Sequence, residues 1–488
     1  MDESLIVDIA IVGLGATGVS LLSQIQDEVY NINNAKRPTI AVFNPSSSFA
    51  SGKAFGDADT LHKVNTPPWM MSVTNMEPDK FGHWLHNKLK QPSGWPARLE
   101  YSQFISQAYH DIRLAGILKI HEYKNNVIAI NRHACGFSIT MEGGNIILGR
   151  KVVMCLGAQA AEIFPGFKKT PGFIEHHLDY QPDNQRPLII AGSGLTAIDA
   201  FRYAWAKGKS NIHLYSRRGY APTCLTNVNN YSPIYLNWRN IVANSEKSNN
   251  ALQTFTHLLR KEYSALGGKD EFKQAMKLLW AGKQKSYFKY LQSRAENADL
   301  PWQDVLVSTR PYMHKLWNAM TLTQRKKFSS EYGALWAAWR HPIPQEVFSE
   351  MIQACSDGRL QLHQSISEPK YDNGQFVLLT RQGKISANYF WDATGGSQNL
   401  EKMEVPILQS LINNKMVEAH PCGGININPL TYECIVGNYP IYGLYNLGPL
   451  SKGCLFSTNA FWFNARCAEN WAKQWALSYV NNAERERS

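Results

Sequence analysis

The apolar residues of this chain fall into two alternating patterns, short unbroken runs and helical spacings. Residues 5–12, 39–43, 188–191 and 211–215 are runs with the length of buried parallel strands. Apolar residues at helical spacing follow the first and the third of these runs. Because strands that alternate with helices build parallel sheets, the pattern predicts an α/β protein.

A complete GxGxxG motif directly follows the first apolar run. Residues 13–18 read GLGATG, and a helical pattern over 19–28 continues from them. Strand, glycine turn and helix in this order form the phosphate-binding half of a Rossmann unit, since glycines let the backbone approach a pyrophosphate at the positive end of the helix. Asn44 ends the next run, where an acidic residue usually binds the adenosine ribose, and its amide is expected to bind there more weakly. The candidate cofactor-binding residues are Gly13, Gly15, Ala16, Thr17, Gly18 and Asn44.

A second glycine loop follows the third apolar run, with Ala197 in place of the usual third glycine. The next strand, 211–215, ends in Ser216-Arg217-Arg218. A hydroxyl and two guanidiniums suit the 2′-phosphate of NADPH better than the free hydroxyl of NADH. An arginine pair on a solvated strand end is the alternative interpretation. The candidates in this second loop and strand are Gly192, Ser193, Gly194, Leu195, Thr196, Ser216, Arg217 and Arg218.

Two such loops imply two nucleotides, most economically FAD at the first and NADPH at the second. The chain is therefore divided into an FAD-binding domain over 1–165 and 385–488, an NADPH-binding domain over 181–225 and 346–384, and a helical insertion over 226–345. Helical spacing within the insertion covers 251–266, 270–282, 287–298 and 321–339.

The insertion is the expected substrate domain, and it carries the most interesting charges. Arg310 and Arg340 are candidate catalytic residues, since an arginine beside a reduced flavin would stabilise a peroxide anion. A salt-bridged structural role is the alternative for each of them. Its tryptophans are either the lining of a substrate pocket or helix-packing residues, namely Trp280, Trp302, Trp317, Trp336 and Trp339.

Composition narrows the class of protein further. The net charge is +11, but the basic residues are scattered and no nucleic-acid motif appears, so anionic cofactors are the expected partners. The eight cysteines contain no CxxC pair and no metal-ligand spacing, which predicts a reducing cytoplasm, no metal and no flavin disulfide reductase. The acidic start lacks the basic region of a signal peptide, and no apolar run has the length of a membrane span, so no membrane partner is expected.

Several motifs resemble class B flavin-dependent monooxygenases, which include Baeyer–Villiger and N-hydroxylating enzymes. Gly172, His176 and Tyr180 have the spacing of that class's FxGxxxHxxx(W/Y) fingerprint, with Thr170 in place of the phenylalanine. The resemblance implies a structural or gating role for His176. The irregular segment 51–85 resembles the stretch that passes the isoalloxazine ring. That match implies a hydrogen bond from Asn65 near the reactive edge of the flavin, and ring contacts from Trp69, Met70, Met71 and Ser72.

The chain as a whole, from about residue 5 to 475, also resembles a bacterial family of FAD/NAD(P)-binding proteins. The motifs that carry this resemblance are GSGLTAIDA, SRRGYAP, WAAWRHPIP, WDATGG and LYNLGPLSKGCLFSTNA, in this order. By analogy, the last helix begins beside the flavin pyrimidine, where its dipole stabilises reduced flavin. The resemblance adds to the cofactor-binding candidates Gly157, Thr394, Gly395, Gly448, Phe456, Ser457 and Thr458.

Together these features predict an oxidoreductase, an NADPH- and O₂-dependent flavin monooxygenase that acts through a flavin C4a-(hydro)peroxide on a small organic substrate. The hydroperoxide would oxygenate nitrogen, sulfur or electron-rich carbon, and the peroxide would attack a carbonyl, which is Baeyer–Villiger chemistry. Some relatives resemble the Baeyer–Villiger-type enzymes of bacterial pyrrolizidine pathways, which implies specialised metabolism. The alternatives are an NADPH-dependent FAD reductase without oxygen transfer and a non-catalytic flavin redox sensor. The oligomeric state does not follow from the sequence.

Overall fold

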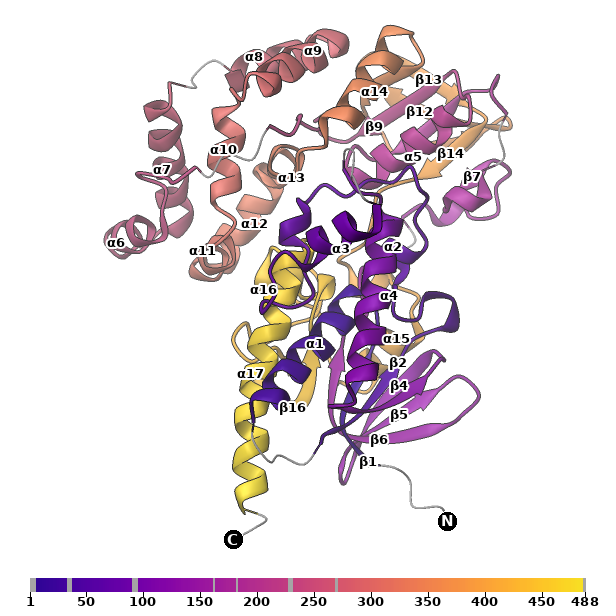
Figure 1. Ribbon diagram of the computed structural model, residues 1–488. Helices are drawn as coiled ribbons and strands as arrows, with labels where there is room; N and C mark the ends of the chain where they lie inside the picture. The colour runs from indigo at the N-terminus through magenta and orange to yellow at the C-terminus, as the bar shows by residue number, and fades with distance from the viewer. Residues whose placement is uncertain are drawn as a thin grey trace. The chain divides into compact units, whose positions relative to one another are not determined.

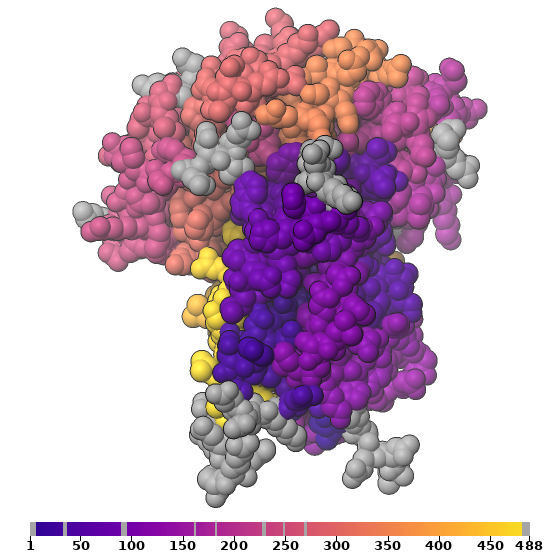
Figure 2. All heavy atoms as spheres, in the orientation of Figure 1, coloured from indigo at the N-terminus to yellow at the C-terminus, as the bar shows by residue number. Residues whose placement is uncertain are grey.

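The computed structural model describes residues 6–32, 37–89, 95–160, 163–180, 183–226, 231–267 and 271–485. The chain divides into two compact units. The first contains Met1–Glu162 and Gly396–Ser488, and the second contains Ile163–Gly395. The residue ranges of each unit can be followed by colour in Figure 1 and Figure 2. Among the residues described, no helix combines the length and the apolar character needed to cross a membrane.

The first unit is built on a mixed sheet with parallel strands at its centre (Figure 1). Ile9 of β1 (Ile6–Val12) lies opposite Ile40 of β2 (Thr39–Phe43) and Lys151 of β6 (Ile146–Met154), and both pairings are parallel. The central strand is buried from Val7 to Val12 except for Asp8, as the continuous apolar run predicts. Within the described residues the strand order is β15 (Glu433–Val436), β16 (Tyr439–Asn446), β6 (Ile146–Met154), β1 (Ile6–Val12), β2 (Thr39–Phe43) and β3 (Lys119–Tyr123), and the hairpin of β4 (Val127–His133) and β5 (Gly136–Met141) joins β6 through β5.

The helices of the first unit come from both ends of the chain. Helix α1 (Ala16–Asn31) packs against α4 (Arg98–Ala115) and against α17 (Phe461–Arg485), as Figure 1 shows. Trp471 and Trp475 on α17 are buried in this core. The shorter helices of the unit are α2 (Lys53–Gly56), α3 (Lys80–Leu89), α15 (Pro406–Asn413) and α16 (Lys452–Leu455).

The second unit has a five-stranded sheet in which every pairing is parallel. Its order is β10 (Leu360–Gln364), β9 (Ile212–Ser216), β8 (Leu188–Ala191), β14 (Tyr389–Asp392) and β7 (Phe173–Ile174). The helices α5 (Leu195–Ala206) and α14 (Gln345–Ser356) accompany it, and an antiparallel sheet is formed by β11 (Lys370–Asp372), β12 (Gln375–Thr380) and β13 (Gly383–Ala387).

One boundary of the predicted FAD-binding domain is wrong. Residues 385–395 were assigned to that domain, but β14 pairs with β8 over Tyr389–Leu188 to Asp392–Ala191 and so belongs to the second sheet. The sequence of a buried apolar strand does not show to which of the two sheets it belongs. Only the strand with which it pairs distinguishes the two assignments.

The insertion is helical, as predicted, but one expected helix is two. The predicted helix 321–339 divides into α12 (Leu322–Glu331) and α13 (Gly333–Arg340), with Tyr332 at φ −112° between them. Gly333, a poor helix former, begins the second piece. The other helices are α6 (Trp238–Ser248), α7 (Ala251–Ala265), α8 (Glu271–Trp280), α9 (Gln284–Glu296), α10 (Pro301–Ser308) and α11 (Met313–Ala319).

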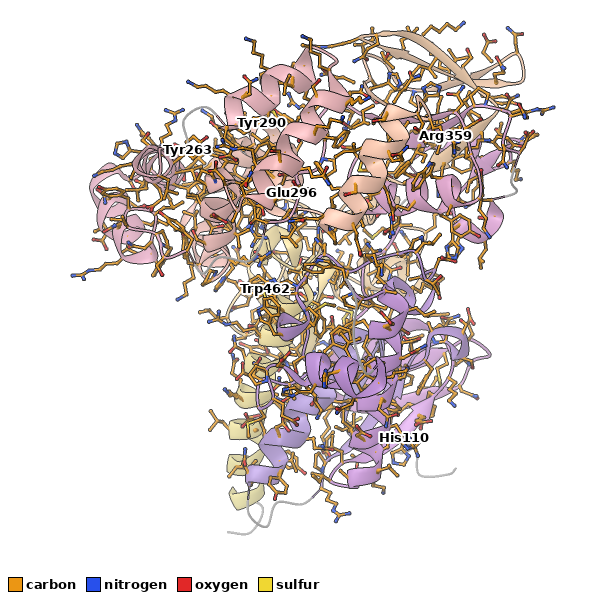
Figure 3. The ribbon with its side chains drawn as sticks, turned by 45° about the horizontal axis from the view of Figure 1, so that its top comes forward. His110, Tyr263, Tyr290, Glu296, Arg359 and Trp462 are labelled. Carbon is orange, nitrogen blue, oxygen red and sulfur yellow. The ribbon has the colours of Figure 1, made fainter. Side chains whose placement is uncertain are left out.

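The tryptophans of the insertion mostly pack helices together. Trp317, Trp336 and Trp339 are buried, and Trp336 meets Phe255 and Phe328 edge-on. Tyr263, labelled in Figure 3, meets Trp302 edge-on with ring centroids 4.8 Å apart. Only Trp280 among the five is largely exposed. The helix-packing interpretation therefore holds for the three buried tryptophans.

Candidate nucleotide-binding sites

The first glycine loop brings the ends of β1 and β6 together. Gly13 has φ +101°, and a Cβ there would lie 2.2 Å from the carbonyl oxygen of Cys155. The N–H of Cys155 donates to the carbonyl of Val12 at 2.7 Å. Gly18 fits tightly as well, since its Cβ would lie 2.2 Å from the carbonyl oxygen of Gly13. A side chain would clash with the backbone at both positions, which explains why the motif has glycine there.

The helix that follows begins without a side-chain cap. Gly15 is the N-cap of α1, with φ −87° and ψ −161°, and the helix has no side-chain cap among the described residues. Uncapped N–H groups at a helix N-terminus are donors for a phosphate. Thr17 in the first turn is buried, and a Cβ on Gly448 would lie 3.5 Å from its hydroxyl. The C-terminal motif therefore lies over the first glycine loop.

Gly52 also adjoins this loop, and sequence reasoning missed it. Its φ is +68°, and a Cβ there would lie 2.8 Å from the Cα of Gly15. The signal in the sequence was weak, because Gly52 stands in the irregular segment 51–85 without a motif of its own. The close approach of two backbones explains why glycine occupies both positions.

Asn44 has a structural role that the motif did not predict. Its Oδ1 accepts from the N–H of Leu14 at 3.0 Å, and its Nδ2 donates to the carbonyl of Ser48 at 2.8 Å. Its own N–H donates to the carbonyl of Tyr123 at 3.2 Å. The side chain thus ties the glycine loop to the carboxyl end of β2, and a contact with the ribose stays a prediction.

The second glycine loop repeats the geometry of the first. Gly192 has φ +122°, and a Cβ there would lie 2.6 Å from the carbonyl oxygen of Ala393. Gly194 caps α5 with φ −85° and ψ −170°, again without a side-chain cap. In this loop Gly194 and Thr196 are exposed, and nothing lies within 4 Å of the Cβ position of Gly194. Ala197 is fully buried 3.4 Å from the Cβ position of Gly192, so alanine fills the place of the third glycine.

Thr394 and Gly395 lie beside the second loop and not in the FAD-binding domain, where residues 385–488 are expected from the sequence. A Cβ on Gly395, whose φ is +83°, would lie 3.5 Å from the hydroxyl of Thr196. The hydroxyl of Thr394 donates to Asp392 at 2.6 Å. Both follow β14, which pairs with β8 in the second sheet. Their assignment to the first domain is therefore wrong for the same reason as the domain boundary.

Ser216, Arg217 and Arg218 directly follow a residue that is bonded to the second loop. The N–H of Gly192 donates to the carbonyl of Tyr215 at 2.8 Å. The Ser216 hydroxyl accepts from the N–H of Gly219 at 3.1 Å, and Arg218 donates to the carbonyl of Ser330 at 2.8 Å. Arg217 is exposed. The exposed guanidinium and the loop thus share one edge of the sheet.

The residues of the predicted ring-facing segment divide into two groups. Met71 and Ser72 are buried, and the Ser72 hydroxyl donates to the carbonyl of Glu77 at 2.7 Å. Trp69 is 52% exposed at the helical turn Pro68–Met70, and Asn65 is half-buried. Of these residues, Trp69 is the most exposed. Contacts of any of them with a flavin ring stay predictions.

The C-terminal motif contains a strained turn. Phe456 has φ +63° and ψ −53°, and the N–H of Ser457 donates to the carbonyl of Leu455 at 2.7 Å, which makes a γ-turn of the rare positive-φ type. The Ser457 hydroxyl is buried and has no partner among the described residues. Thr458 donates to the carbonyl of Pro449 at 3.3 Å. Such strain concentrates at functional sites, and the orphaned hydroxyl is a donor for a bound group.

The positive charges of Arg310 and Arg340 interact, although the two residues are thirty positions apart in the sequence. Arg340 is 3% exposed, and burial together with the charge of Arg310 lowers its pKa to about 9. Arg310 is half-buried, and burial lowers its pKa too. Among the described residues, no carboxylate forms an ion pair with Arg340. The salt-bridge interpretation of Arg340 is therefore not supported by its surroundings.

His176 stabilises a local turn. Its Nδ1 accepts from the N–H of Leu178 at 3.3 Å, and its own N–H donates to Asp179 at 3.0 Å. Tyr180 stacks on Trp391 with ring centroids 5.6 Å apart. These contacts agree with a structural role, and gating stays a prediction.

Gly157 ends the segment after β6 with φ +73° and open space around its Cβ position. The chain then leaves the first unit and returns to it at Gly396. The N–H of Ser397 donates to the carbonyl of Gln159 at 2.8 Å, so the leaving and the returning segments are joined.

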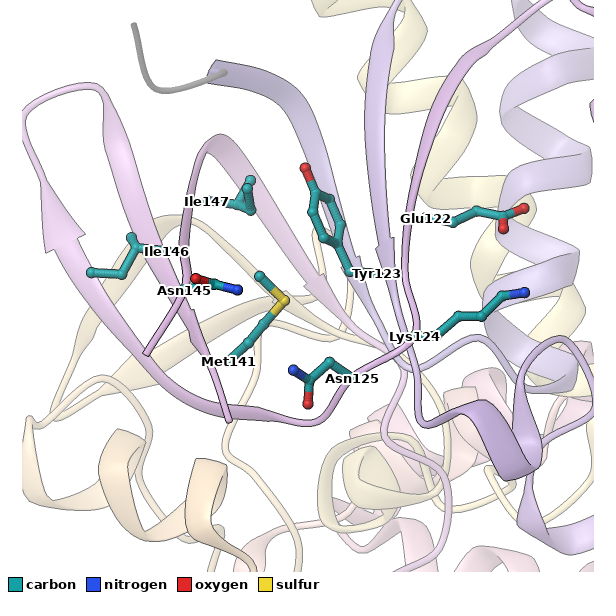
Figure 4. A pocket seen from close by; sticks show the side chains of 8 residues that line it. All are labelled: Glu122, Tyr123, Lys124, Asn125, Met141, Asn145, Ile146 and Ile147. Atoms are coloured by element: carbon teal, nitrogen blue, oxygen red, sulfur yellow. The ribbon is translucent and has the colours of Figure 1, made fainter. Parts of the chain in front are cut away.

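A hollow of about 480 Å³ lies beside strands β3 to β6 of the first unit (Figure 4). Lys124 and Asn125 from the end of β3 line it together with Met141 and Asn145 from the β5–β6 turn. None of the predicted site residues lines this hollow.

Comparisons with known proteins agree with the two-nucleotide interpretation at the level of the fold. Residues 10–159 match the family model described as FAD-NAD(P)-binding. No curated protein matches the sequence. The chain is similar to the ornithine N-hydroxylase of Kutzneria sp. 744, solved with reduced FAD, NADP⁺ and L-ornithine, at 12% identity and a TM-score of 0.58 over 99% of this chain and 100% of that one.

Two further solved structures show how widely this fold is used. The L-lysine 6-monooxygenase of Pseudomonas syringae matches at 13% identity and a TM-score of 0.58 over 97% of this chain and 100% of that one. The bacillithiol disulfide reductase of Bacillus cereus matches at 10% identity and a TM-score of 0.50 over 97% and 100%. The resemblance to N-hydroxylating flavin monooxygenases is thus confirmed for the fold, and residues 10–159 carry the signature of a FAD-NAD(P)-binding segment.

Proposed function

We propose that this chain is an NADPH- and O₂-dependent flavin monooxygenase. The observation that carries the proposal is the pair of equivalent glycine loops, one in each unit. Gly13 and Gly192 both have positive φ and both meet a carbonyl oxygen of a neighbouring parallel strand. Each loop leads into a helix whose first N–H groups lack a side-chain cap. Two such sites suit two dinucleotides.

The residues packed around the two loops favour FAD, and not NADPH, as the ligand of the first loop. There Thr17 is buried and Gly52 and Gly448 approach closely, which suits a cofactor that stays bound. The uncapped start of α1 would bind its pyrophosphate, and the orphaned Ser457 hydroxyl would hydrogen-bond to the ring system. Asn65 and Trp69 are proposed to lie at the ring, as the resemblance implies. When bound, FAD takes electrons from NADPH and activates O₂ for transfer to the substrate.

The second loop suits a nucleotide that exchanges in each turnover. Gly194 and Thr196 are exposed there, and the exposed Arg217 follows the strand end that binds Gly192. A guanidinium at this position recognises a 2′-phosphate, so NADPH is proposed as the electron donor.

The cysteines argue against a disulfide reductase, although one shares the fold. All eight cysteines lie within the described residues, and none of them forms a disulfide there. Cys155 is the one next to the first loop, but its carbonyl faces Gly13, and burial raises the pKa of its thiol well above the usual range. Cys434 and Cys454 lie near one another, and both are buried. A redox-active pair needs an accessible thiolate, and neither place provides one.

The kind of oxygen transfer is the finer part of the proposal. Two of the structural neighbours are an ornithine N-hydroxylase and an L-lysine 6-monooxygenase, which act on amino acids with a side-chain amine. We favour N-hydroxylation of an amine on that basis. Baeyer–Villiger oxidation of a carbonyl, in a specialised pathway of pyrrolizidine type, is the second candidate and rests on the sequence resemblance.

The test compares the NADPH that the flavin-loaded protein oxidises with the O₂ it consumes and the products it forms. NADPH oxidation, O₂ uptake and hydrogen peroxide release are measured with L-ornithine, L-lysine and a bicyclic ketone, and the products are identified by mass. An oxygenated amine supports N-hydroxylation, and a lactone or ester supports the Baeyer–Villiger reaction. NADPH consumption with all oxygen recovered as peroxide indicates a reductase. Bound flavin without NADPH consumption indicates a redox sensor.

A further inference from the structure

The helical insertion of the second unit contains a buried cation with an open hydrogen-bonding edge. Arg340 is the last residue of α13 and is 3% exposed. Its Nε and Nη2 atoms are buried, and neither has a partner among the described residues. A buried charge without a partner is strongly unfavourable, so its retention requires a reason.

Among the residues that the structure describes, the hydrogen bond of the Arg340 side chain does not compensate its charge. Nη1 lies 3.2 Å from Nε2 of His341, and Nδ1 of His341 lies 3.1 Å from the carbonyl oxygen of Ala337. Because a carbonyl only accepts, Nδ1 carries the proton and Nε2 accepts from the arginine. That histidine is therefore neutral. The ring of Trp336 lies 6.0 Å from the guanidinium and contributes a weak cation–π interaction at most.

Another arginine of the same unit shows what such an edge binds. Arg202 is 5% exposed, and its Nε and Nη2 donate to the two carboxylate oxygens of Glu350 at 2.5 and 2.8 Å. These are the same two nitrogens that Arg340 leaves without a partner. A planar carboxylate fits this side of a guanidinium in a bidentate arrangement.

Arg310 adds a second positive charge that acts on Arg340. This charge opposes the protonated state of that residue. Two like charges in a poorly hydrated region repel each other, and an anion placed between them removes the repulsion. Arg310 is half-buried, whereas Arg340 is 3% exposed.

We propose that the Nε–Nη2 edge of Arg340 is a carboxylate-binding subsite for the substrate, where the charge of Arg310 adds to the attraction for an anion. The substrate is then a small molecule that bears a carboxylate. This inference depends on the proposed function only in calling the bound molecule the substrate, because a carboxylate can bind to the subsite without turnover. Both arginines act on the same anion, and this replaces the choice of one of them as a partner of the flavin.

The experiment measures the melting temperature of the FAD-loaded protein in sodium acetate and in acetamide, at an ionic strength held constant with sodium chloride. Acetate and acetamide have the same shape, and only acetate carries the charge. The wild-type protein is expected to melt several degrees higher in acetate than in acetamide. R340Q should lose this difference and melt at the wild-type temperature or above it in chloride, because the unpaired charge is gone. R340K keeps the positive charge but lacks the two parallel N–H donors of the guanidinium, so it should show a smaller difference in melting temperature between acetate and acetamide.

The matched control is R359Q. Arg359 lies in the same unit, is exposed and is labelled in Figure 3. This variant should keep the full acetate effect. An acetate effect that persists in both R340Q and R340K overturns the proposal. A uniform loss of melting temperature in R340Q and R340K, with the acetate effect intact, would instead show a structural role at the end of α13.

The nucleotide is the other possible source of an oxyanion. R340Q should leave the dissociation constant of NADPH unchanged within about threefold, and inorganic phosphate should replace acetate poorly. A tenfold weaker NADPH affinity in R340Q, with a phosphate effect equal to that of acetate, would assign the subsite to the nucleotide and overturn the substrate assignment. If NADPH is never consumed while the acetate effect remains, the proposed function fails and the subsite stands.

Discussion

Replacement of Gly194 by alanine should weaken nucleotide binding while it leaves the stability of the fold nearly unchanged. Gly194 has φ −85° and ψ −170°, which any residue adopts, and no atom lies within 4 Å of its Cβ position. Alanine as an N-cap costs up to about 1 kcal/mol relative to glycine. The reduced freedom of the unfolded chain offsets about 0.4–1 kcal/mol of this cost. The ligand-free protein should therefore melt within about 2 °C of the wild type.

The same methyl group should weaken NADPH binding strongly. It stands beside the uncapped N–H groups of α5, where a pyrophosphate would bind. Loss of one hydrogen bond to a charged group costs about 1.5–3 kcal/mol. That corresponds to a dissociation constant about 10- to 150-fold higher.

The assay is calorimetric titration of NADPH into G194A, with G192A for comparison. In G192A the new Cβ would lie 2.6 Å from the carbonyl oxygen of Ala393 at a φ of +122°, so this variant should lose stability before any ligand is added. G194A should lose affinity alone. NADPH binding by G194A within threefold of the wild type would refute the assignment of this loop to the pyrophosphate.

Three other predictions concern the first loop, the phosphate selectivity and pH. G13V should yield a protein without flavin absorbance and with a lower melting temperature, because its Cβ would lie 2.2 Å from the carbonyl of Cys155; retained yellow colour would contradict the FAD placement. R217A should raise the KM for NADPH at least tenfold more than that for NADH, and equal changes would remove the 2′-phosphate assignment. Burial and the neighbouring His213, 3.1 Å away, lower the pKa of His363 to about 4, so the folded state keeps it neutral while the unfolded chain takes up a proton near pH 6.5. The melting temperature should therefore be steady above about pH 6.5 and fall as the pH decreases toward 4, and H363Q should flatten that decrease.

The local parts of both sites were predictable because they depend on a few neighbouring residues. A strand, a glycine with positive φ and an uncapped helix follow one another within about ten positions, and the sequence displays all three at Gly13 and again at Gly192. The helices of the insertion were predictable from spacing for the same reason. The FAD-NAD(P)-binding match over residues 10–159 includes the first of these two loops.

The features that sequence reasoning missed depend on pairing across long distances. The strand Tyr389–Asp392 has the composition of a buried strand in any parallel sheet, and its partner β8 lies about two hundred residues earlier. Gly52 looks like any loop glycine until the backbone of Gly15 is found beside it. Arg310 and Arg340 were noticed one at a time, since no periodicity relates them, and only the packing of the insertion brings their charges together.

The division of the first unit between the two ends of the chain has a consequence for synthesis on the ribosome. Strand β16 pairs with β6, and α17 packs on α1, so the core of that unit needs residues from both ends. Every strand of the second unit lies within Ile163–Gly395 and is complete earlier. At about 5–20 residues per second, the roughly 300 residues between β6 and α17 take about 15–60 s to add. During that interval the apolar face of β1 and β6 lacks its final cover, and transiently exposed apolar surface of this kind is prone to aggregation.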